Sequence, residues 1–487
     1  MDNFIDEIRR VQKDPLVQAI LAAYKGRVYL VGGSVRDLLL NRYIADYDLV
    51  VAGDLESTAL RAAETLGVRA IHLGRDPKTV FRLVFDGRIL DLCTIEGDDI
   101  HADLARRDLT VNALALPLAE TGKETELLDP FSGRQDLDNR VARFISEANV
   151  LADPVRMLRL FRFSSNLDLT PDAASLDIVR RHADKIRQSA GERLGEEFMH
   201  ILGAGVAHST ILSMLDTGLL EAMFPEMTSL RSVGQGENHH LDVLNHTMAV
   251  LDHLETILSV PDKYWPDHVD EVLDYLSIEG KKRLLKLTVL LHDLGKPASK
   301  TEDESGEIHF YGHEITGLEP AGRVMDRLRL GNDVKSFVNL IIRHHLRLFH
   351  LLEVTQTSEL TPRAVHRLSR DLGDEIWGLI IHSMADAEGT LGPARLEHGG
   401  PTAFLELTKT FMAELHRQKE RVSGSPPLLN GHDLMDILGI RPGPLLGRIL
   451  GDIEEARATG RISEKDQAIE LARRVFQDLS AKSGGLD

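Results

Sequence analysis

The chain has 487 residues, of which 43% are apolar and 27% charged, a composition typical of a globular protein with two to four domains. No run approaches the roughly 18 consecutive apolar residues of a membrane span, and the first segment, MDNFIDEIRRVQKD, lacks the apolar stretch of a signal peptide. A single cysteine, Cys93, excludes an internal disulfide. We therefore predict a cytoplasmic protein with no membrane partner.

Charge argues against an extended nucleic-acid-binding surface. The chain carries 57 basic and 76 acidic residues, a net charge of −19, whereas nucleic-acid binding needs cations facing phosphates. Residues 134–193 differ, with eleven Arg or Lys and nine Asp or Glu, a local balance of +2 (11 − 9). This segment permits an RNA-binding face without establishing one, and a DNA partner is not expected.

The predicted elements change character along the chain. Residues 1–25 predict one helix, and residues 26–130 predict mixed strands and helices. Strand composition occurs in VYLVGG, YDLVVAG, RAIHLG, VFRLVF and RILDLCT, with helices at 34–40 and 55–66. From about residue 140 the pattern is helical almost throughout, so the fold class is an α/β amino-terminal part followed by all-α parts.

The segment VGGSVRDLLLNRYIADYD at 31–48 joins a strand-like run to two glycines and then to two carboxylates. Glycines lacking a Cβ let backbone N–H groups approach phosphate oxygens, and Arg36 can add a bidentate contact. Alternate strand residues place Asp46 and Asp48 on one face, where carboxylate oxygens suit Mg²⁺. Alone, the segment is equally compatible with an ordinary turn, so its meaning depends on the motifs that follow.

Four later motifs follow in a fixed order. They are ILDLCT at 89–94, DLARRDLTVNALAL at 103–116, LLDPFSGRQDL at 127–137 and DPVRMLRLFRF at 153–163. As an ordered set, the motifs make the chain resemble the class II tRNA nucleotidyltransferase (CCA-adding) and bacterial poly(A) polymerase family. The resemblance implies a polymerase-β-like palm that transfers nucleotides from CTP and/or ATP to the 3′ end of tRNA without a template.

The resemblance also implies roles for individual residues. Catalysis and Mg²⁺ binding fall to Asp46 and Asp48, with Asp91 as the third carboxylate and Asp86 of the FDGR turn as its competitor. The expected nucleotide-binding residues are Gly33, Arg36, Arg107, Asp108, Asn112, Asp153, Arg156 and Arg159. Arg107, Asp108 and Asn112 are placed at the start of a predicted helix, whereas Arg106 is expected on a solvated helix face.

Asp153, Arg156, Arg159 and Arg162 recur at three-residue steps and predict a stripe on a helix. A carboxylate beside a guanidinium can read the Watson–Crick edge of C or A, so the protein would act as the template. An i, i+3 ion pair within the helix is the structural alternative. Ala152 and Leu109 depart from the family pattern, which usually has Glu and Phe there, so base selection is open.

A third departure concerns the length of one connection. Only eleven residues separate Asp91 from Asp103, whereas CCA-adding and poly(A) members generally carry a longer flexible loop there. A missing loop resembles members that add only CC. We therefore hold CC addition as a hypothesis beside full CCA synthesis or repair.

The second half contains a separate set of metal-ligand residue types. His246, the His292-Asp293 dipeptide followed by LGK, and Asp386 follow the H…HD…D order and resemble HD-domain phosphohydrolases. Imidazole and carboxylate suit Mn²⁺, Ni²⁺, Fe²⁺ or Zn²⁺, and metal-bound water can attack a phosphoester. These four residues are the expected ligands. His313 and His345 could hold a second ion, although ordinary helix-end histidines explain them almost as well. Spacing does not decide whether His344 or His345 faces the site. Lys296 could balance phosphate charge.

The predicted domains are a palm at 1–130, a helical nucleotide-selecting and RNA-binding neck at 131–232, an HD domain at 233–400 and a helical tail at 401–487. Two alternatives to tRNA extension stay open. One is a poly(A) polymerase, which is disfavoured because the last thirty residues are mixed rather than basic. The other is an HD phosphohydrolase acting on nucleotides or RNA 2′,3′-cyclic phosphate ends, with the head as a recognition module.

Overall fold

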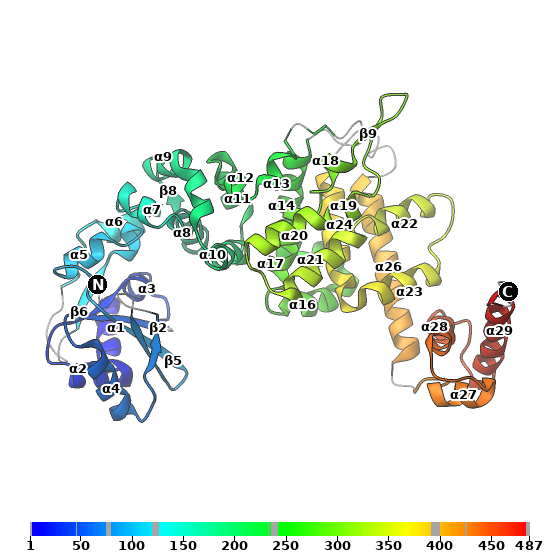
Figure 1. Ribbon diagram of the computed structural model, residues 1–487, viewed down its shortest axis with the longest axis horizontal. Helices are drawn as coiled ribbons and strands as arrows, with labels where there is room; N and C mark the ends of the chain where they lie inside the picture. Colours follow the sequence, from blue (N-terminus) through cyan, green and yellow to red (C-terminus); the bar gives the residue numbers. More distant parts are fainter. Residues whose placement is uncertain are drawn as a thin grey trace. The chain divides into compact units, whose positions relative to one another are not determined.

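The computed structural model describes residues 2–44, 46–74, 79–118, 126–231, 233–234, 242–390, 400–423 and 426–483. The chain divides into two compact units, Met1–Phe224 and Pro225–Asp487, and each is described by itself (Figure 1). Residues 235–241, near the predicted boundary between neck and HD domain, and 391–399, before the predicted tail, lie outside the described residues.

The first unit begins with two helices, α1 (Asp2–Lys13) and α2 (Pro15–Ala23), so the prediction of one helix over 1–25 is wrong. Pro15 has no backbone N–H and cannot continue the hydrogen bonding of α1. Asp14 instead caps α2, because its carboxylate accepts a 3.0 Å hydrogen bond from the backbone N–H of Leu16.

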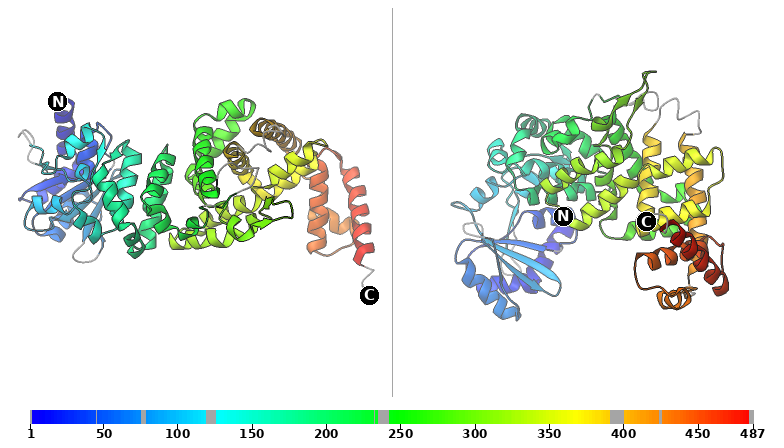
Figure 2. Two further views of the ribbon diagram at one scale, coloured as in Figure 1. Left: turned by 90° about the horizontal axis from the view of Figure 1, so that it is seen from above. Right: turned by 45° about the vertical axis from the view of Figure 1, so that its right-hand side comes forward.

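A six-stranded sheet follows, in the order β3-β4-β5-β2-β1-β6. Its strands are β1 (Val28–Val31), β2 (Asp46–Val51), β3 (Ile71–Leu73), β4 (Val80–Phe85), β5 (Arg88–Thr94) and β6 (Ala115–Leu118). Strands β2 and β5 are parallel, and the other pairs are antiparallel. The right-hand view of Figure 2 shows these strands as blue arrows. All five predicted strands are present.

Different helices lie against the two faces of the sheet. The head helices are α3 (Gly33–Leu39), α4 (Leu55–Leu66), α5 (Ile100–Ala105) and the short 3₁₀ helix η1 (Thr110–Asn112). The Tyr47 hydroxyl donates a 2.9 Å hydrogen bond to Asp14, so this face of β2 looks toward the start of α2. On the other face, Val31 and Val50 pack with Ile100 and Leu104 of α5. Asp46 and Asp48 share this second face, since side chains alternate along a strand.

The rest of the first unit is helical apart from the short parallel pair β7 (Val141–Ala142) and β8 (Thr170–Pro171). Its helices are α6 (Gly133–Asp138), α7 (Glu147–Ala152), α8 (Arg156–Leu167), α9 (Ala173–His182), η2 (Ala183–Gln188), α10 (Gly191–Gly203), α11 (His208–Asp216) and α12 (Leu219–Met223). Helix α8 buries Met157, Leu158, Leu160 and Phe161, and α10 packs against it. Arg159 and Arg162 of α8 reach Glu197 of α10, at 3.5 and 3.0 Å.

The second unit is helical in its described residues apart from the hairpin β9 (Thr301–Glu302) and β10 (Ile308–His309). Its first helices are α13 (Pro225–Thr228), α14 (Val243–Ser259), α15 (Pro261–Tyr264), η4 (Pro266–His268), α16 (Val269–Ser277), α17 (Lys281–Leu291), α18 (Lys296–Ser299) and α19 (His313–Thr316). Then follow α20 (Leu318–Arg327), α21 (Asn332–His344), α22 (Arg347–Thr355), α23 (Pro362–Leu372), η5 (Gly373–Glu375), α24 (Ile376–Gly389) and α26 (Gly400–Val422). Helix α14 packs on α24 and α17, which brings distant histidines together.

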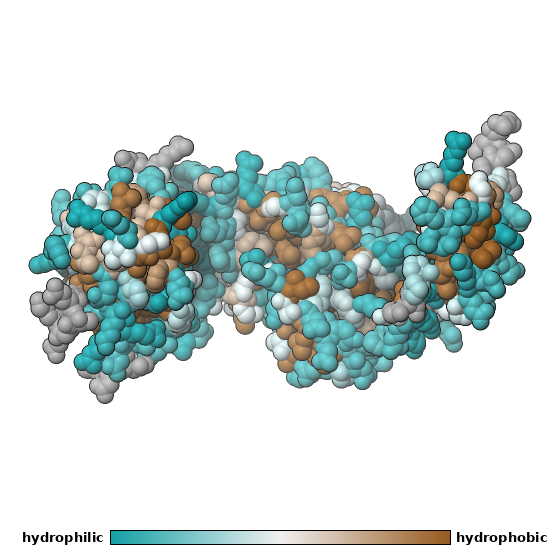
Figure 3. Space-filling model, turned by 90° about the horizontal axis from the view of Figure 1, so that it is seen from below, coloured by the Kyte–Doolittle hydropathy of each residue, from teal (hydrophilic) through white to brown (hydrophobic). Residues whose placement is uncertain are grey.

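Three helices end the described chain: α27 (Gly431–Leu438), α28 (Pro444–Ala458) and α29 (Lys465–Ser483). Pro444 is the first residue of α28, so the Pro-Gly-Pro sequence starts a helix rather than forming a phosphate loop. Leu446, Ile449 and Ile453 are buried between the three helices. Figure 3 shows that apolar residues still reach the surface of this part, at the right of the view.

Within the described residues, every helix is too short or too polar to cross a membrane.

Candidate functional sites

Three carboxylates lie on one face of the head sheet. Asp46 and Asp48 are on β2, and Asp91 on β5 pairs directly with Asp48 in the parallel register. Arg82 of β4 holds Asp91 through two 2.8 Å contacts, from Nε to Oδ1 and from Nη2 to Oδ2. Carboxylate oxygens are hard ligands, so this face of the sheet offers the ligand type that a divalent cation such as Mg²⁺ prefers.

The charge state of Asp48 depends on its surroundings. Burial of the carboxylate by the surrounding protein raises its pKa to about 6; Asp91 and Asp46 add to the rise, and Arg107 opposes it. Part of the side chain is nevertheless exposed to a cavity. A group of carboxylates that repel one another is suited to a cation that would relieve the repulsion.

The glycine turn before α3 allows close approach by an arginine. Gly32 has φ +67°, and a Cβ there would lie 2.6 Å from Nη1 of Arg107. Gly33 is the glycine expected to bind the nucleotide. A Cβ added there would meet only the flexible Arg36 guanidinium, at 3.3 Å, so close packing requires glycine less strictly at this position than at Gly32. Ser34 Oγ donates to Asp46 O and accepts from Asp48 N, both at 3.0 Å, and so joins the turn to β2.

Hydrogen bonds between buried polar side chains link the head to α8. Arg36 Nη1 donates to Asn112 Oδ1 at 2.7 Å, and Asn112 Nδ2 donates to Asp108 Oδ1 at 3.1 Å. Arg159 Nε donates to the other oxygen of Asp108 at 2.6 Å. Burial alone would raise the pKa of Asp108, but the Arg159 charge and these hydrogen bonds lower it. Asp108 and Asn112 therefore hold two guanidiniums in fixed positions, from a 3₁₀ turn rather than from the predicted helix start.

The expected base-reading pair sits at the start of α8. Asp153 precedes the helix, and its carboxylate accepts from Arg193 of α10 at 2.9 and 2.7 Å. Arg156 is the first residue of α8 and donates to the carbonyl of Arg107 at 3.0 Å. The carboxylate of Asp153 thus contacts a helix 40 residues further along the chain.

Phe163 is a site residue that the sequence analysis missed. Guanidinium carbons of Arg36, Arg159 and Arg162 lie 5.1, 5.4 and 4.3 Å from the centre of its ring. Arg162 Nε also lies 3.0 Å from Oε2 of Glu197. The ring and the carboxylate together keep three cations side by side despite their repulsion. In the sequence, the pattern RLFRF at 159–163 was the only local feature that could have pointed to Phe163.

These residues line a cavity of about 760 Å³ in the first unit. Its walls contain all eight expected nucleotide-binding residues: Gly33, Arg36, Arg107, Asp108, Asn112, Asp153, Arg156 and Arg159. Asp48 also lines the cavity, and further lining residues that were not predicted are Arg42, Tyr43, Phe163, Arg193 and His200. Arg106 lines it too, although its side chain is 40% exposed and pairs with Glu96 and Asp103.

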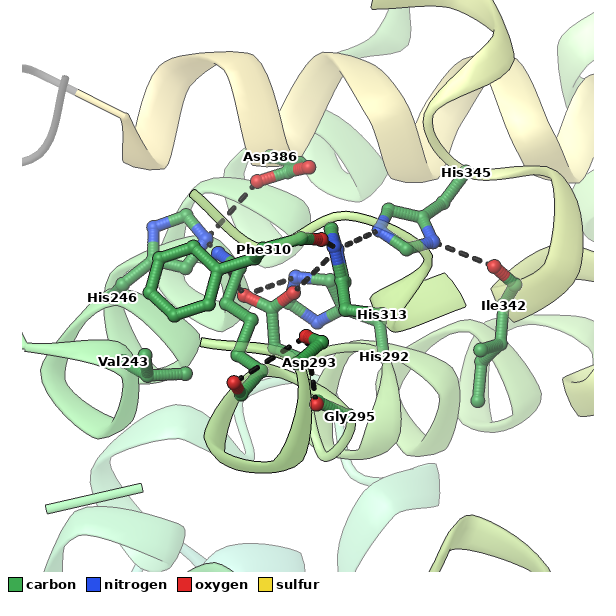
Figure 4. A network of polar contacts seen from close by, with 12 residues as sticks. Val243, His246, His292, Asp293, Gly295, Phe310, His313, Ile342, His345 and Asp386 are labelled. Atoms are coloured by element: carbon green, nitrogen blue, oxygen red, sulfur yellow. Dashed lines mark hydrogen bonds and ion pairs between the residues drawn. The ribbon is translucent and has the colours of Figure 1, made fainter. Parts of the chain in front are cut away.

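The second unit contains a buried cluster of histidines and aspartates (Figure 4). His246 Nε2 lies 3.1 Å from Asp386 Oδ1 and 3.5 Å from Asp293 Oδ2. His292 Nε2 lies 3.2 Å from the same Asp293 oxygen. Lys296 Nζ is 2.7 Å from Asp293, so its ammonium neutralises part of the charge. The four residues expected as ligands therefore do come together.

The two additional histidines also face this cluster. His313 Nε2 lies 3.4 Å from Asp293 Oδ1 and 3.1 Å from His345 Nε2. His345 is buried, whereas its neighbour His344 is only partly buried, so the structure selects the residue that spacing could not. Asp293, His313 and His345 offer ligand atoms within 4.8 Å of one another, as do His246, His292 and Asp293.

Backbone carbonyls orient the rings of four histidines. The Nδ1 atoms of His246, His292, His313 and His345 contact the carbonyls of Gly389, Val289, Phe310 and Ile342 at 3.2, 2.8, 2.8 and 2.6 Å. An Nδ1–H that donates to a carbonyl leaves the Nε2 lone pair directed into the cluster. Second contacts of this kind are typical of metal-binding histidines.

The protonation pattern of the cluster also suits a cation. Burial alone would raise the pKa values of Asp293 and Asp386, but the surrounding histidines, and Lys296 at Asp293, lower both well below the usual range. Burial lowers the pKa of His345 and brings that of His382 to about 3. His382, one turn before Asp386, was not predicted. Burial would lower the pKa of His292, but the Asp293 and Asp386 carboxylates raise it, so a bound cation would take the place of a proton between these groups.

Models of known families match parts of both units of the chain. The Poly A polymerase head domain matches residues 28–143, and the "Probable RNA and SrmB- binding site of polymerase A" matches 168–230. The HD domain matches residues 243–372.

Similar proteins extend over nearly the whole chain. The A-adding tRNA nucleotidyltransferase of Deinococcus radiodurans is 32% identical over 92% of this chain and 95% of its own length. The CC-adding tRNA nucleotidyltransferase of Thermus thermophilus is 30% identical over 90% and 91%. A solved CCA-adding enzyme with CTP is 20% identical, with a TM-score of 0.65 over 97% of this chain and 98% of that chain.

The sheet with its carboxylates, the helical segment after it and the histidine cluster define a nucleotidyltransferase with an HD domain. More specifically, the chain belongs to the family of class II CCA-adding tRNA nucleotidyltransferases and poly(A) polymerases.

Proposed function

We propose that this protein transfers nucleotides from CTP and/or ATP to the 3′ end of tRNA without a nucleic-acid template. The observation that carries the proposal is the cavity in which eight expected nucleotide-binding residues gather beside Asp48. The membership of the chain in a family whose named relatives add A or CC to tRNA supports the substrate. The four-domain division at 1–130, 131–232, 233–400 and 401–487 is part of this proposal.

The reaction assigns different tasks to the two ends of the nucleotide. Arg36 and Arg107 bind the triphosphate. Asp46, Asp48 and Asp91 would hold Mg²⁺, which would lower the pKa of the attacking hydroxyl and neutralise the leaving group. A bond forms between the RNA 3′ oxygen and the α-phosphorus while the bond from the α-phosphorus to the bridging oxygen breaks. The hydroxyl proton passes to solvent, and pyrophosphate leaves.

Base selection is assigned to the start of α8. Arg193 fixes the Asp153 carboxylate through two contacts, and Asp108 fixes Arg159. A fixed carboxylate accepts from the exocyclic amine of C or A, and Arg156 or Arg159 donates to the ring acceptors. Bases that lack this amine are disfavoured because they donate no hydrogen bond to the carboxylate.

The connection between β5 and α5 favours CC addition as the finer specificity. Only residues 95–99 join Thr94 to Ile100, and all of them are described, so the long loop of full CCA-adding members has no counterpart here. A tRNA truncated to its discriminator base, supplied with CTP and ATP, should gain two C residues at single-nucleotide resolution. A complete CCA end would reject the CC-only specificity, and addition of A to a tRNA already ending in CC would favour the activity of the Deinococcus relative.

The HD cluster supports a second activity, a metal-dependent phosphatase or phosphodiesterase. His246, His292, Asp293 and Asp386 would hold one Mn²⁺, Ni²⁺, Fe²⁺ or Zn²⁺ ion, and His313 with His345 would help to hold a second. A bound ion would supply an acidic water, and RNA 2′,3′-cyclic phosphate ends and nucleotides are the substrates to test.

Two variants separate the activities. Asp46→Ala combined with Asp48→Ala should abolish incorporation of radiolabelled CMP or AMP into truncated tRNA and leave phosphoester hydrolysis unchanged. His292→Ala should do the reverse. If both variants are folded and each loses both activities, the assignment to two sites is wrong. Long homopolymer tails of A on unstructured RNA would instead identify a poly(A) polymerase.

A further inference from the structure

The segment that follows the hairpin β9–β10 carries an exposed aromatic side chain close to the histidine cluster. Tyr311 is 76% exposed, the largest exposed fraction among the large apolar side chains of the described residues. His309 lies two residues earlier, where an extended chain places a side chain on the same side. The rings of His309 and Tyr311 stack, with centres 5.1 Å apart and planes 16° apart. One face of the Tyr311 ring therefore rests on His309, and the other is open to solvent.

Hydrogen bonds within the hairpin hold this stacked pair in place. Asp303 Oδ1 accepts from the backbone N–H groups of Ser305 and Glu307, at 2.9 and 3.0 Å. Asp303 Oδ2 lies 3.1 Å from His309 Nε2, so the turn fixes the imidazole on which Tyr311 rests. The hairpin is at the label β9 in Figure 1. An exposed ring that is already oriented loses less conformational entropy when a ligand stacks on it.

Phe310, which lies between the two stacked rings in the sequence, connects them to the HD cluster. Its carbonyl lies 2.8 Å from His313 Nδ1, and its ring centre lies 5.6 Å from Lys296 Nζ, beside the cluster (Figure 4). Tyr311 and His313 are two residues apart, so their Cα atoms are separated by at most about 7 Å. The exposed ring is therefore a close neighbour of the expected metal site without belonging to it.

A flat aromatic ring with one open face suits a nucleobase, because every base has a π face that can stack on it. A phosphate ester without a base makes no such contact. We propose that Tyr311, supported by His309, binds the base of a nucleoside phosphate whose phosphate group lies at the HD cluster. This inference rests on the proposed phosphohydrolase activity and names what its substrates share, a nucleobase, either in a free nucleotide or at the end of an RNA.

Two substrates that differ only in the base test the contact. Tyr311→Ala should raise KM for adenosine 2′,3′-cyclic phosphate about tenfold, the order of one lost stacking contact, and leave kcat unchanged. The KM for ribose 2,3-cyclic phosphate, which has no base, should not change. Tyr311→Phe should keep both wild-type values, since the ring and not the hydroxyl makes the contact. An equal rise in KM for both substrates, or no rise for the adenosine compound, would overturn the proposal.

Two controls separate base stacking from a structural role. Ile315→Ala removes another exposed side chain close to His313, 51% exposed, and should change neither KM. Elemental analysis should find the same metal content in Tyr311→Ala as in wild type. Loss of metal from Tyr311→Ala would show that the residue supports the cluster instead, and would overturn the proposal.

The wild-type protein provides a test that needs no variant. Its KM for ribose 2,3-cyclic phosphate should be about tenfold higher than its KM for the adenosine compound, and equal values would reject the base contact. A trinucleotide with a 2′,3′-cyclic phosphate end should have a lower KM than the mononucleotide if an RNA end is the substrate, and a higher KM if a free nucleotide is. In either case Tyr311→Ala should raise it. Failure of wild-type protein with Mn²⁺ to hydrolyse any of these compounds would instead reject the phosphohydrolase activity itself.

Discussion

The nucleotide cavity and the HD cluster contain similar side chains but suit different ligands. In the cavity, arginines and aspartates remain charged and are paired with one another around a space of about 760 Å³, which suits a large, charged and exchangeable ligand. In the cluster, buried imidazoles lie within 3.1–3.5 Å of carboxylates, and burial keeps His345 and His382 neutral. Such spacing suits a small cation held for long periods. The geometry of the partners, more than residue type, thus separates substrate binding from metal binding.

The largest expected effect concerns the third carboxylate of the cavity site. Asp91→Asn should lower the incorporation of CMP at least about 100-fold, because a weaker ligand replaces a metal-binding carboxylate. Asp86→Asn is the matched control: Asp86 lies in a turn with φ +49°, which Asn adopts readily, so activity should stay within about twofold. Steady-state kinetics would show which aspartate acts, and the reverse result would exchange their roles.

Loss of metal should be the next largest effect. His292→Ala removes a ligand whose Nδ1 is already fixed by Val289, so metal affinity should fall at least about tenfold. His344→Ala, the neighbouring histidine of the His344-His345 pair, should leave the metal content unchanged. Metal would be measured by elemental analysis after dialysis, alongside tRNA extension, which neither variant should change. Equal metal content in wild type and His292→Ala would remove the HD site from the account.

The hydrogen bonds of the buried Asp108 carboxylate in the cavity predict an effect on stability. Asp108→Asn removes the carboxylate that accepts from Arg159 and should lower the free energy of unfolding of the first unit by about 3 kcal/mol. Because the folded-state pKa of Asp108 lies below 3.8, its ordinary value, the wild-type advantage is present above about pH 4 and is lost as pH falls toward the folded-state pKa. Urea unfolding at pH 7 and at pH 3.5 would show a smaller difference at the lower pH. An equal difference at both would contradict the assigned charge.

The smallest effect is expected at Phe163. Phe163→Leu keeps an apolar side chain but removes the ring beside Arg36, Arg159 and Arg162. The KM for CTP should rise about threefold, as expected for loss of a partly exposed cation–π contact. Phe163→Tyr should restore the wild-type value. A KM unchanged in both variants would show that the ring does not hold the guanidiniums.

Local patterns predicted much of this molecule, and long-range contacts account for most of what was missed. The strands, the Asp46 and Asp48 spacing and the HD dipeptide are local, and the structure has them where they were expected. The contact of Asp153 with Arg193 spans 40 residues, so spacing suggested a neighbour instead. The break between α1 and α2 was available from Asp14-Pro15 in the sequence. The choice of His345 over His344 depends on how α21 packs, which no local pattern contains.

The most direct test of the central claim is a crystal structure with CTP and Mn²⁺ in place of Mg²⁺. The account predicts anomalous density between the carboxylates of Asp46 and Asp48, with the triphosphate against Arg36 and Arg107. Manganese absent from these carboxylates, with CTP bound elsewhere, would contradict it.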